Sequence, residues 1–232
     1  MKALVSHSGG VDSTTCLAMA VEDFGAKNVS TVSFIYGQKL DKELECAAKL
    51  AEFYGVNHYI VNLSEVFQYS DCSLLKKSTQ KVAQKTYFEQ VQKNGSGIIS
   101  SYVPFRNGVF LASVASVALS VYPCEEVSVY IGAQANDSVN NTYADCSVSF
   151  VEAMNRAIQA GTYKKVQLVA PIVNMSKAQV IATGLRLKVP YELTWTCYEG
   201  GEKPCGKCAA CQDRVAAFRA NGFEDPVRYK GE

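Results

Sequence analysis

The stretch "HSGGVDST" (residues 7–14) lies between a short apolar run and a segment with helical spacing. The run "KALVS" precedes it, and "TTCLAMAVEDFG", which ends on Gly25, overlaps its end. An apolar run of strand length, then glycines, then a helix predicts a strand–turn–helix unit. The first N–H groups of a helix lack intrahelical partners, and the helix dipole places partial positive charge there. The stretch therefore predicts a loop that binds phosphate.

Glycines and hydroxyl groups support this prediction. Gly9 and Gly10 permit positive φ and let a phosphate approach the backbone without a Cβ in the way. Ser8, Ser13 and Thr14 add hydroxyl donors. A Walker A loop needs a lysine after its last glycine and a dinucleotide loop needs G-x-G-x-x-G, and neither pattern is present. The alternative without a ligand is a capped turn in which Ser8 or Ser13 is the N-cap.

Length and composition predict one large domain, or one domain with a small appendage. The chain has 232 residues, of which 48% are hydrophobic and 19% charged, as in an ordinary globular protein with ample core. A net charge of +1 gives no general reason to expect nucleic-acid or membrane binding. Neither an apolar run of transmembrane length nor a signal-peptide pattern is present, so we expect a cytoplasmic protein.

Strands and helices are predicted to alternate along the chain. The alternation indicates βαβ units in an α/β fold, with a doubly wound, Rossmann-like parallel sheet covered on both faces. Ligands of such sheets lie outside the carboxyl ends of the strands. Beyond the first unit, we predict strands at 29–37, 58–63, 125–133 and 165–172, and helices at 38–55, 107–122, 147–161 and 176–189.

Two segments carry further expectations. The helix at 107–122 is apolar nearly all round, so we expect it to be deeply buried. Residues 64–102 are polar and lack a clear period, although 81–93 has the pattern of a short helix. This segment is either an insertion that acts as a functional lid or a partly disordered surface insertion.

Four of the nine cysteines lie close together near the C-terminus. An odd number of cysteines without an export signal argues against a disulfide framework. Cys197, Cys205, Cys208 and Cys211 form the pattern C-x₇-C-x₂-C-x₂-C, which predicts a closed, structural Zn²⁺ site. An Fe–S cluster and a redox pair are the alternatives. We therefore predict a small zinc-stapled lobe at 191–232 beside an α/β domain at 1–190.

The loop "SGGVDS" resembles the pyrophosphate loop of the PP-loop ATPases, the adenine nucleotide α-hydrolase-like (HUP) fold. With further motifs, the chain resembles one family within this group, the 7-cyano-7-deazaguanine synthase (QueC) family of queuosine biosynthesis. The resemblance extends from the first strand to the last cysteine. These motifs are "YGQ" (36–38), "VPFRN" (103–107), "GA…D" (132–137), "DC" (145–146), "PI…SK" (171–177) and "PYELTWTCYEGGEKPCGKCAAC" (190–211).

The resemblance implies an ATP-dependent carbon–nitrogen ligase. Such an enzyme converts 7-carboxy-7-deazaguanine and ammonia to the 7-nitrile through two successive adenylations, from carboxylate to amide and from amide to nitrile. Each round releases AMP and pyrophosphate. The resemblance also implies ATP bound with Mg²⁺, a structural zinc and a homodimer, with no direct role for nucleic acid or membrane.

The resemblance assigns roles to residues of this chain. Asp12 helps to place Mg²⁺, and Lys177, at a predicted helix N-terminus, neutralises the α-phosphate, unless it is a solvated first-turn lysine. Arg106 contacts phosphate or the substrate carboxylate, unless "VPFRN" only begins the helix. Asp137 and Asp145 are candidates to bind the guanine-like edge, although turns also favour aspartate. The ATP-binding loop comprises Ser8, Gly9, Gly10, Val11, Asp12, Ser13 and Thr14.

Two aromatic residues beside Cys197 and three positions that differ from the family pattern bear on substrate binding. Trp195 and Tyr198 either stack on a base or pack the metal lobe. The family often has histidine at the position of Leu40, and "YPDCR" where this chain has Ala144 and Ser147. These changes leave the nucleotide chemistry intact but weaken the assignment of the substrate.

Three alternative functions remain from the sequence. The first is a QueC-like ligase that stops at the amide or uses another amine. The second is a tRNA-modifying PP-loop enzyme, which the near-zero net charge and the single-domain length disfavour. The third is an inactive, zinc-stapled nucleotide-binding module.

Overall fold

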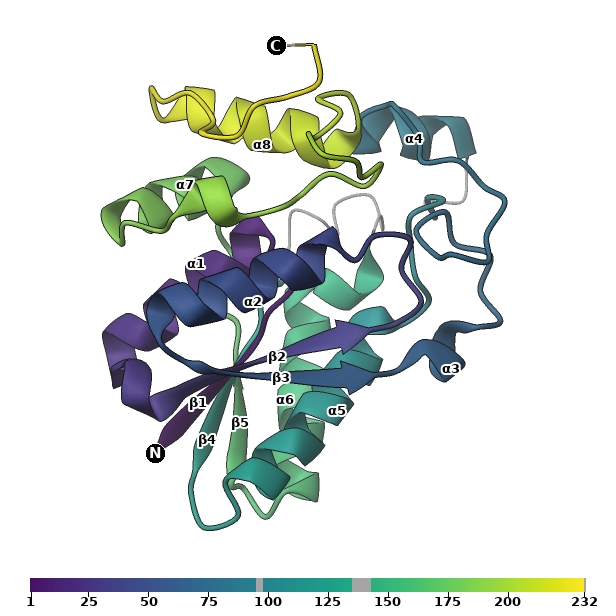
Figure 1. The fold of residues 1–232 in the computed structure, drawn as a ribbon. Coiled ribbons are helices and arrows are strands. Elements are labelled where there is room, and N and C mark those ends of the chain that lie inside the picture. Colours follow the sequence, from purple (N-terminus) through teal and green to yellow (C-terminus); the bar gives the residue numbers. More distant parts are fainter. Residues whose placement is uncertain (95–97, 135–142, 232) are drawn as a thin grey trace.

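The computed structural model describes residues 1–94, 98–134 and 143–231 (Figure 1). Within these residues the sheet has five parallel strands in the order β3-β2-β1-β4-β5. They are β1 (Lys2–Ser6), β2 (Val29–Ile35), β3 (Asn57–Asn62), β4 (Val127–Tyr130) and β5 (Val166–Val169). The strand order reverses between β1 and β4, so the ligand crevice is expected at their carboxyl ends. The predicted doubly wound fold is confirmed.

Helices cover both faces of the sheet (Figure 1). Because side chains alternate along a strand, Ala3 and Val5 of β1 face one side, and Leu4 faces the other. Every helix in the described part of the chain is too short or too polar to cross a bilayer. The first face carries α1 (Val11–Phe24), α2 (Lys42–Tyr54) and α7 (Lys177–Arg186), and the second carries α5 (Arg106–Val121) and α6 (Val148–Gly161).

Helix α5 buries one face and exposes the other, so the expectation of a deeply buried helix is wrong. Leu111, Val114 and Ala118 pack against the sheet and α6. Ala112 and Ser116 on the opposite side are exposed. The sequence misled because alanine and serine are small enough to be tolerated on either face, so the apolar character of the helix did not mark its buried side.

Residues 64–94 pack beside the carboxyl end of β2. Two short helices, α3 (Ser64–Phe67) and α4 (Tyr87–Asn94), flank an irregular stretch, and α4 bears out the helix predicted within 81–93. Gln38 pairs with Leu75, and the N–H of Lys39 donates to the Leu74 oxygen at 2.8 Å. These contacts place the described part of the segment against the crevice. The cluster beneath it contains Tyr36, Phe67, Cys72, Leu74, Leu75 and Val103.

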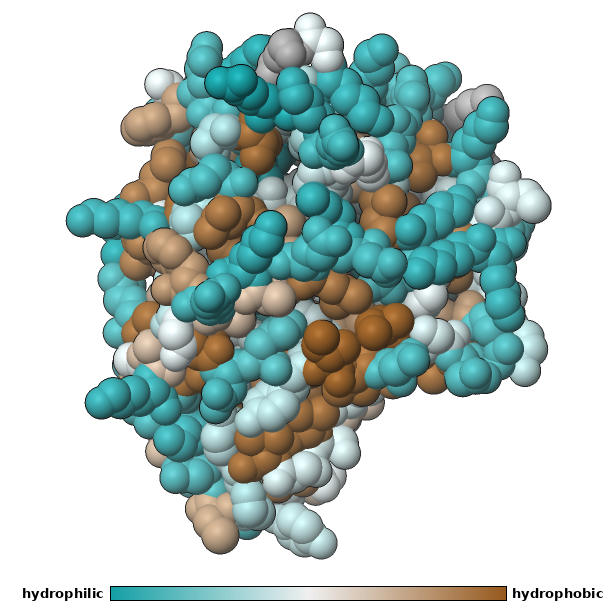
Figure 2. All heavy atoms as spheres, viewed as in Figure 1, coloured by the Kyte–Doolittle hydropathy of each residue, from teal (hydrophilic) through white to brown (hydrophobic). Residues whose placement is uncertain are grey.

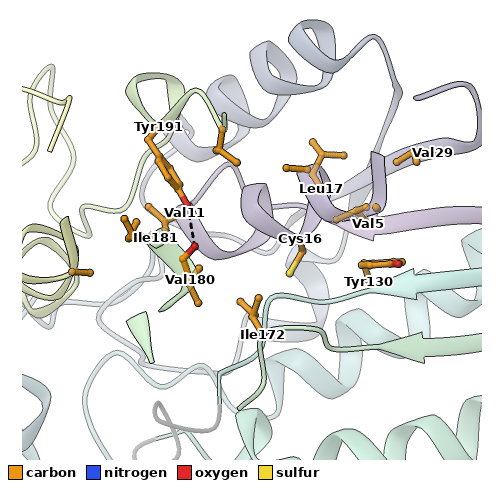
Figure 3. Close-up of a cluster of buried hydrophobic side chains, with 14 of the residues drawn as sticks. Val5, Val11, Cys16, Leu17, Val29, Tyr130, Ile172, Val180, Ile181 and Tyr191 are labelled. Carbon is orange, nitrogen blue, oxygen red and sulfur yellow. Dashed lines mark hydrogen bonds between the residues drawn. The ribbon is translucent and has the colours of Figure 1, made fainter. Parts of the chain in front are cut away.

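The C-terminal helix α8 (Ala209–Ala220) lies on α7 (Figure 1) and contributes Phe218 to the cluster of α1 and α7. Tyr191 lies in the same cluster (Figure 3), with its ring edge-on to Phe218 at 5.3 Å. The Tyr191 hydroxyl lies 2.8 Å from Thr15 Oγ1 and donates to the Val180 oxygen at 3.4 Å. One apolar cluster therefore spans the boundary predicted at residue 190, and the division itself stays a prediction.

A buried ion pair ties α8 to its neighbours. The side chains of Arg214 and Asp225 are only 3% and 4% exposed. Arg214 Nε donates to Asp225 Oδ2 at 2.7 Å, and Nη2 donates to Oδ1 at 2.9 Å. The guanidinium also donates to Thr194 Oγ1 at 2.7 Å and to the Tyr191 oxygen at 2.9 Å. The bidentate pair joins α8 to the chain that follows it, and the bonds to Thr194 and Tyr191 pin α8 to the segment that follows α7.

We expect Asp225→Asn to lower the free energy of unfolding by about 3 kcal/mol or more, because it leaves the Arg214 guanidinium buried without its counter-charge. The control Glu22→Gln breaks the exposed ion pair with Arg186. The side chain of Arg186 is 60% exposed and that of Glu22 is 50% exposed. It should change stability by less than about 1 kcal/mol. Urea unfolding followed by circular dichroism measures both variants, and equal losses would contradict the role given to the buried pair.

Candidate functional site

The predicted phosphate loop joins the end of β1 to the start of α1. Gly10 is the N-cap of α1 and makes no side-chain capping bond. The alternative in which Ser8 or Ser13 caps the helix is therefore wrong. The Ser13 hydroxyl instead accepts the N–H of Ser8 at 3.1 Å and shapes the loop. An uncapped helix start leaves N–H groups for an anionic ligand, which fits the prediction.

Gly9 is the residue of this loop that requires glycine. Its φ is +79°, whereas φ of Gly10 is −84°, so the positive φ expected at Gly10 is not found. A Cβ on Gly9 would lie 2.4 Å from the Glu43 oxygen and 2.7 Å from the Ala47 nitrogen. The missing Cβ therefore makes room for the backbone of α2, which is pressed against the loop.

Two buried side chains support the loop from within. Thr14 Oγ1 donates to the Gly10 oxygen at 2.7 Å and lies 3.1 Å from His7 Nε2. Burial, with a smaller contribution from His58, lowers the pKa of His7 to about 3, so its imidazole is neutral. A direct phosphate contact by the Thr14 side chain stays a prediction.

Asp12 and Lys177 meet at the start of two helices. Lys177 Nζ donates to Asp12 Oδ2 at 2.6 Å, although 165 residues separate them, and each side chain is 26% exposed. Lys177 is the first residue of α7, which a capping box of Ser176 and Gln179 fixes. Asp12 Oδ1 is buried and lacks a hydrogen-bond partner in the described part of the chain. This orphaned oxygen fits a divalent cation, because carboxylate oxygen is the ligand that Mg²⁺ prefers.

Asp213 of α8 stands near this pair, and the sequence analysis missed it. Burial raises the pKa of Asp213, the charge of Lys177 opposes that shift, and the charge of Asp12 adds to it. No local spacing marks this residue as part of the site, because only the packing of α8 on α7 brings it there.

A cavity of about 240 Å³ opens beside the phosphate loop. Arg106, at the first turn of α5, enters its wall with the guanidinium 5.6 Å from the centre of the Tyr36 ring. Glu43, at the first turn of α2, was not identified from the sequence. Burial raises the pKa of Glu43 to about 7, and the charge of Arg106 opposes this shift. The lining includes Asp12, Ser13, Tyr36, Glu43, Arg106 and Tyr198.

Of the two aspartates predicted to bind the guanine-like edge of the substrate, the structure describes Asp145. Asp145 is 5% exposed, and its Oδ2 accepts the N–H of Asn107 at 2.9 Å. It therefore supports the start of α5, whose N-cap is Phe105. Contact between Asp145 and substrate stays a prediction. Asp137 lies outside the described residues.

The three positions that depart from the family pattern lie in the described part of the chain. Leu40 lines the cavity and packs on Gly200, where a Cβ would lie only 2.2 Å from Leu40 Cδ2. Ser147 caps α6 by accepting the N–H of Phe150 at 3.2 Å. Ala144 lies in the short 3₁₀ helix Ala144–Cys146 just before it.

The four C-terminal cysteines form one buried cluster, with all Sγ atoms within 4.8 Å of one another. The N–H groups of Cys205 and Cys208 donate to Cys197 Sγ and Cys205 Sγ, each at 3.3 Å. Hydrogen bonds from the Cys208 and Cys211 thiols lower the pKa of Cys197. Four converging sulfurs with N–H support could bind a metal ion. All nine cysteines are described, and none forms a disulfide.

The metal lobe contacts both the loop and the cavity through Trp195. Its backbone N–H donates to the Gly9 oxygen at 2.9 Å, and its indole Nε1 donates to the Cys197 oxygen at 2.9 Å. Its side chain is buried with the cysteines and also lines the cavity, as Tyr198 does. The packing role expected for Trp195 is therefore present, and stacking on a base stays a prediction.

Comparison with known proteins identifies the family. The family model described as queuosine biosynthesis protein QueC matches residues 2–222. The 7-cyano-7-deazaguanine synthase of Caldicellulosiruptor saccharolyticus is 42% identical over all of this chain and 97% of its own length. Those of Pseudoalteromonas atlantica and Archaeoglobus fulgidus are each 38% identical, over 99% and 98% of this chain and 99% and 90% of their own lengths. The chain therefore belongs to the QueC family.

Proposed function

We propose that this protein is an ATP-dependent ligase that converts 7-carboxy-7-deazaguanine and ammonia to 7-cyano-7-deazaguanine. Family membership supports the proposal, because the compared relatives carry the name of that synthase. The observation within this chain that carries it is the contact between Lys177 and Asp12. That contact joins the N-termini of α1 and α7 beside a cavity that holds Arg106. Such an arrangement suits nucleotide phosphates next to an acidic substrate.

The first round requires activation of a carboxylate. A carboxylate resists ammonia because oxide would have to leave, whereas its adenylate releases AMP. The phosphate loop from Ser8 to Ser13 would hold the pyrophosphate of ATP, and Lys177 would offset negative charge that develops on the α-phosphate. Arg106 would bind the carboxylate that attacks. Mg²⁺ held at Asp12 would neutralise charge on the phosphates.

The second round repeats this chemistry on the amide. The amide oxygen attacks a second ATP, and departure of AMP leaves the nitrile. Both rounds need the same pyrophosphate loop, so one site is sufficient. Asp137 and Asp145 would contact the ring of the substrate. Ammonia would enter the first round as the free nucleophile.

We also propose zinc for the cysteine cluster, in a structural role. Four buried sulfurs leave no open coordination position for a reactant, which is the character of a structural site. The 191–232 lobe would then be held together by its metal.

The homodimer is proposed from the family resemblance. Apolar side chains gather over β3 and α5 (Figure 2). Ile60 on the edge strand β3 is 55% exposed, and Val66 on α3 is 53% exposed. This surface is the one we assign to a second copy of the chain, and light scattering of the purified protein would establish its mass. No nucleic-acid partner is proposed, because the net charge is only +1.

The proposed activity is tested by mass-resolved turnover. The protein would be mixed with 7-carboxy-7-deazaguanine, ammonium, ATP and Mg²⁺, and bases and nucleotides would be quantified together. We expect the nitrile with two AMP per product. The amide with one AMP would support the ligase that stops early, and consumption of ATP only with tRNA would support the tRNA-modifying alternative. Absence of turnover with every substrate would support the inactive module.

Replacement of Lys177 by alanine should lower kcat/KM for AMP formation by about 100-fold or more, because the developing phosphate charge loses a fixed cation. Lys27→Ala, at an exposed lysine beyond the far end of α1, is the matched control and should behave as the parent. Steady-state AMP production at saturating substrate and varied ATP measures the difference. Equal activity of the two variants would remove Lys177 from the proposed site.

Metal analysis should find about one zinc per chain and no visible absorption near 400 nm, since Zn²⁺ is colourless and Fe–S clusters are not. Cys208→Ser should lose the metal and lower Tm by about 10 °C, because binding energy is also folding energy. Cys124→Ser changes an exposed cysteine outside the cluster and should alter neither property. Iron with visible absorption would overturn the zinc assignment.

A further inference from the structure

Glu43 places a carboxylate in the cavity and has no role in the two rounds described above. The acidic side chains among the described lining residues are Asp12 and Glu43. Asp12 is bonded to Lys177. Within the described residues, no donor forms a hydrogen bond or an ion pair with the Glu43 carboxylate. Glu43 is half-buried, and a carboxylate that lines a ligand cavity without such a partner is a candidate for a function there.

Helix α2 brings the backbone of Glu43 close to the phosphate loop. The backbone of Glu43 lies so near Gly9 that a Cβ there would be 2.4 Å from the Glu43 oxygen. Asp12 and Ser13 at the start of α1 line the same cavity, as does Arg106 from α5. Glu43 therefore lines the space shared by the loop proposed for phosphate and the arginine proposed for the acidic substrate.

The nitrile-forming round needs a proton acceptor in this space. When the amide oxygen bonds to the α-phosphorus, the P–O bond to pyrophosphate breaks and pyrophosphate takes its electron pair. Loss of one N–H proton then leaves a neutral imidoyl adenylate. The C–O bond next breaks, AMP takes its electron pair, and the second N–H proton departs as the C≡N bond forms. Both hydrogens of the amide thus leave as protons, and no oxidant or reductant is needed.

The two histidines do not meet this need. The pKa of His7 is lowered to about 3, mainly by burial, so it is a poor base near neutral pH. His58 belongs to β3, and its Nδ1 lies 2.8 Å from Thr31 Oγ1. His58 is not among the residues that line the cavity.

We propose that Glu43 is the general base of the nitrile-forming round, accepting N–H protons of the bound amide and passing them to solvent through the cavity. The inference rests on the proposed function, since only an amide intermediate presents these protons. Glu43 is thereby assigned as a catalytic residue of the second round and not as a binding group of the ring.

The surroundings of Glu43 tune it for this role. Burial raises its pKa to about 7 and Arg106 opposes the shift, and a base is most effective when its pKa lies near the working pH. Because the base acts ionised, nitrile formation should fall as pH drops below about 7. Other titratable groups share the cavity with Glu43, and they come from elements on every side of it. They are His7, Asp12, Tyr36, Lys39, Tyr87, Arg106, Tyr143, Cys146 and Tyr198. The charge of Glu43 also acts on the Cys46 thiol of α2.

Glu43→Gln tests the inference because it keeps the shape and removes the base. With 7-carboxy-7-deazaguanine, ammonium, ATP and Mg²⁺, amide and nitrile are separated by mass and AMP is counted. We expect nitrile formation to fall by about 100-fold or more. Amide should accumulate with one AMP each, at a rate within about tenfold of the parent, because attack by ammonia needs this base less. The acidic limb of the nitrile pH profile near 7 should disappear.

Matched variants separate this effect from damage to the fold. Glu45→Gln alters an exposed carboxylate two residues further along α2 and should behave as the parent. Glu43→Asp keeps a carboxylate and should restore part of the nitrile formation. Because burial raises the pKa of Glu43 above its unfolded value, the ionised side chain destabilises the fold above about pH 7. Glu43→Gln should therefore be at least as stable as the parent at pH 8 in a urea titration.

Two results would overturn the inference. One is nitrile formation by Glu43→Gln at the rate of the parent. The other is an equal loss in both rounds with a raised KM for the deazaguanine, which would make Glu43 a ring-binding residue. Failure of the proposed function looks different: the parent itself then forms no AMP that depends on 7-carboxy-7-deazaguanine, and the inference falls with it.

Discussion

The close approach of backbones at Gly9 is the contact on which the site depends. Its φ of +79° turns the chain between β1 and α1, and its missing Cβ admits the first turn of α2. Its carbonyl oxygen accepts the N–H of Trp195 from the metal lobe. Three parts of the chain therefore converge on one residue: the phosphate loop, the helix that carries Glu43 and the segment that leads into Cys197. Any side chain at this position would force them apart.

The C-terminal lobe supports this convergence through two sets of contacts. The Arg214 guanidinium holds Thr194 and the Tyr191 oxygen in place, directly before the Trp195 N–H that bonds to Gly9. The cysteine cluster fixes the chain on the other side of Trp195, since Cys197 is one of its four sulfurs. A metal in that cluster would stiffen the phosphate loop from outside, so its influence on nucleotide binding would be mechanical. This is why a closed coordination site suits the position.

Local spacing made much of the fold and part of the site predictable. Helix α1 ends at Gly25 as predicted, although it begins at Val11, three residues before the segment with helical spacing, and the four cysteines converge as their spacing indicated. The contact between Lys177 and Asp12, the position of Glu43 and the presence of Asp213 were not predictable in this way. Each depends on how one helix packs against another, which a periodicity does not encode. The same limit explains α5, whose small residues left its exposed side unmarked.

The two rounds of the proposed reaction differ in their protons and not in their phosphate chemistry, and the distribution of groups around the cavity matches this difference. In the proposed function, the phosphate loop, Asp12 and Lys177 would bind the nucleotide, which is the same in both rounds. In the first round, bound ammonia loses one proton as the amide forms. In the second round, two N–H protons must be removed, one from the O-adenylated amide and one as the C–O bond breaks, so a base has more to do in that round. The Glu43 carboxylate, which lines the same cavity as the phosphate loop, would give a shared phosphate site the one group that the second round adds.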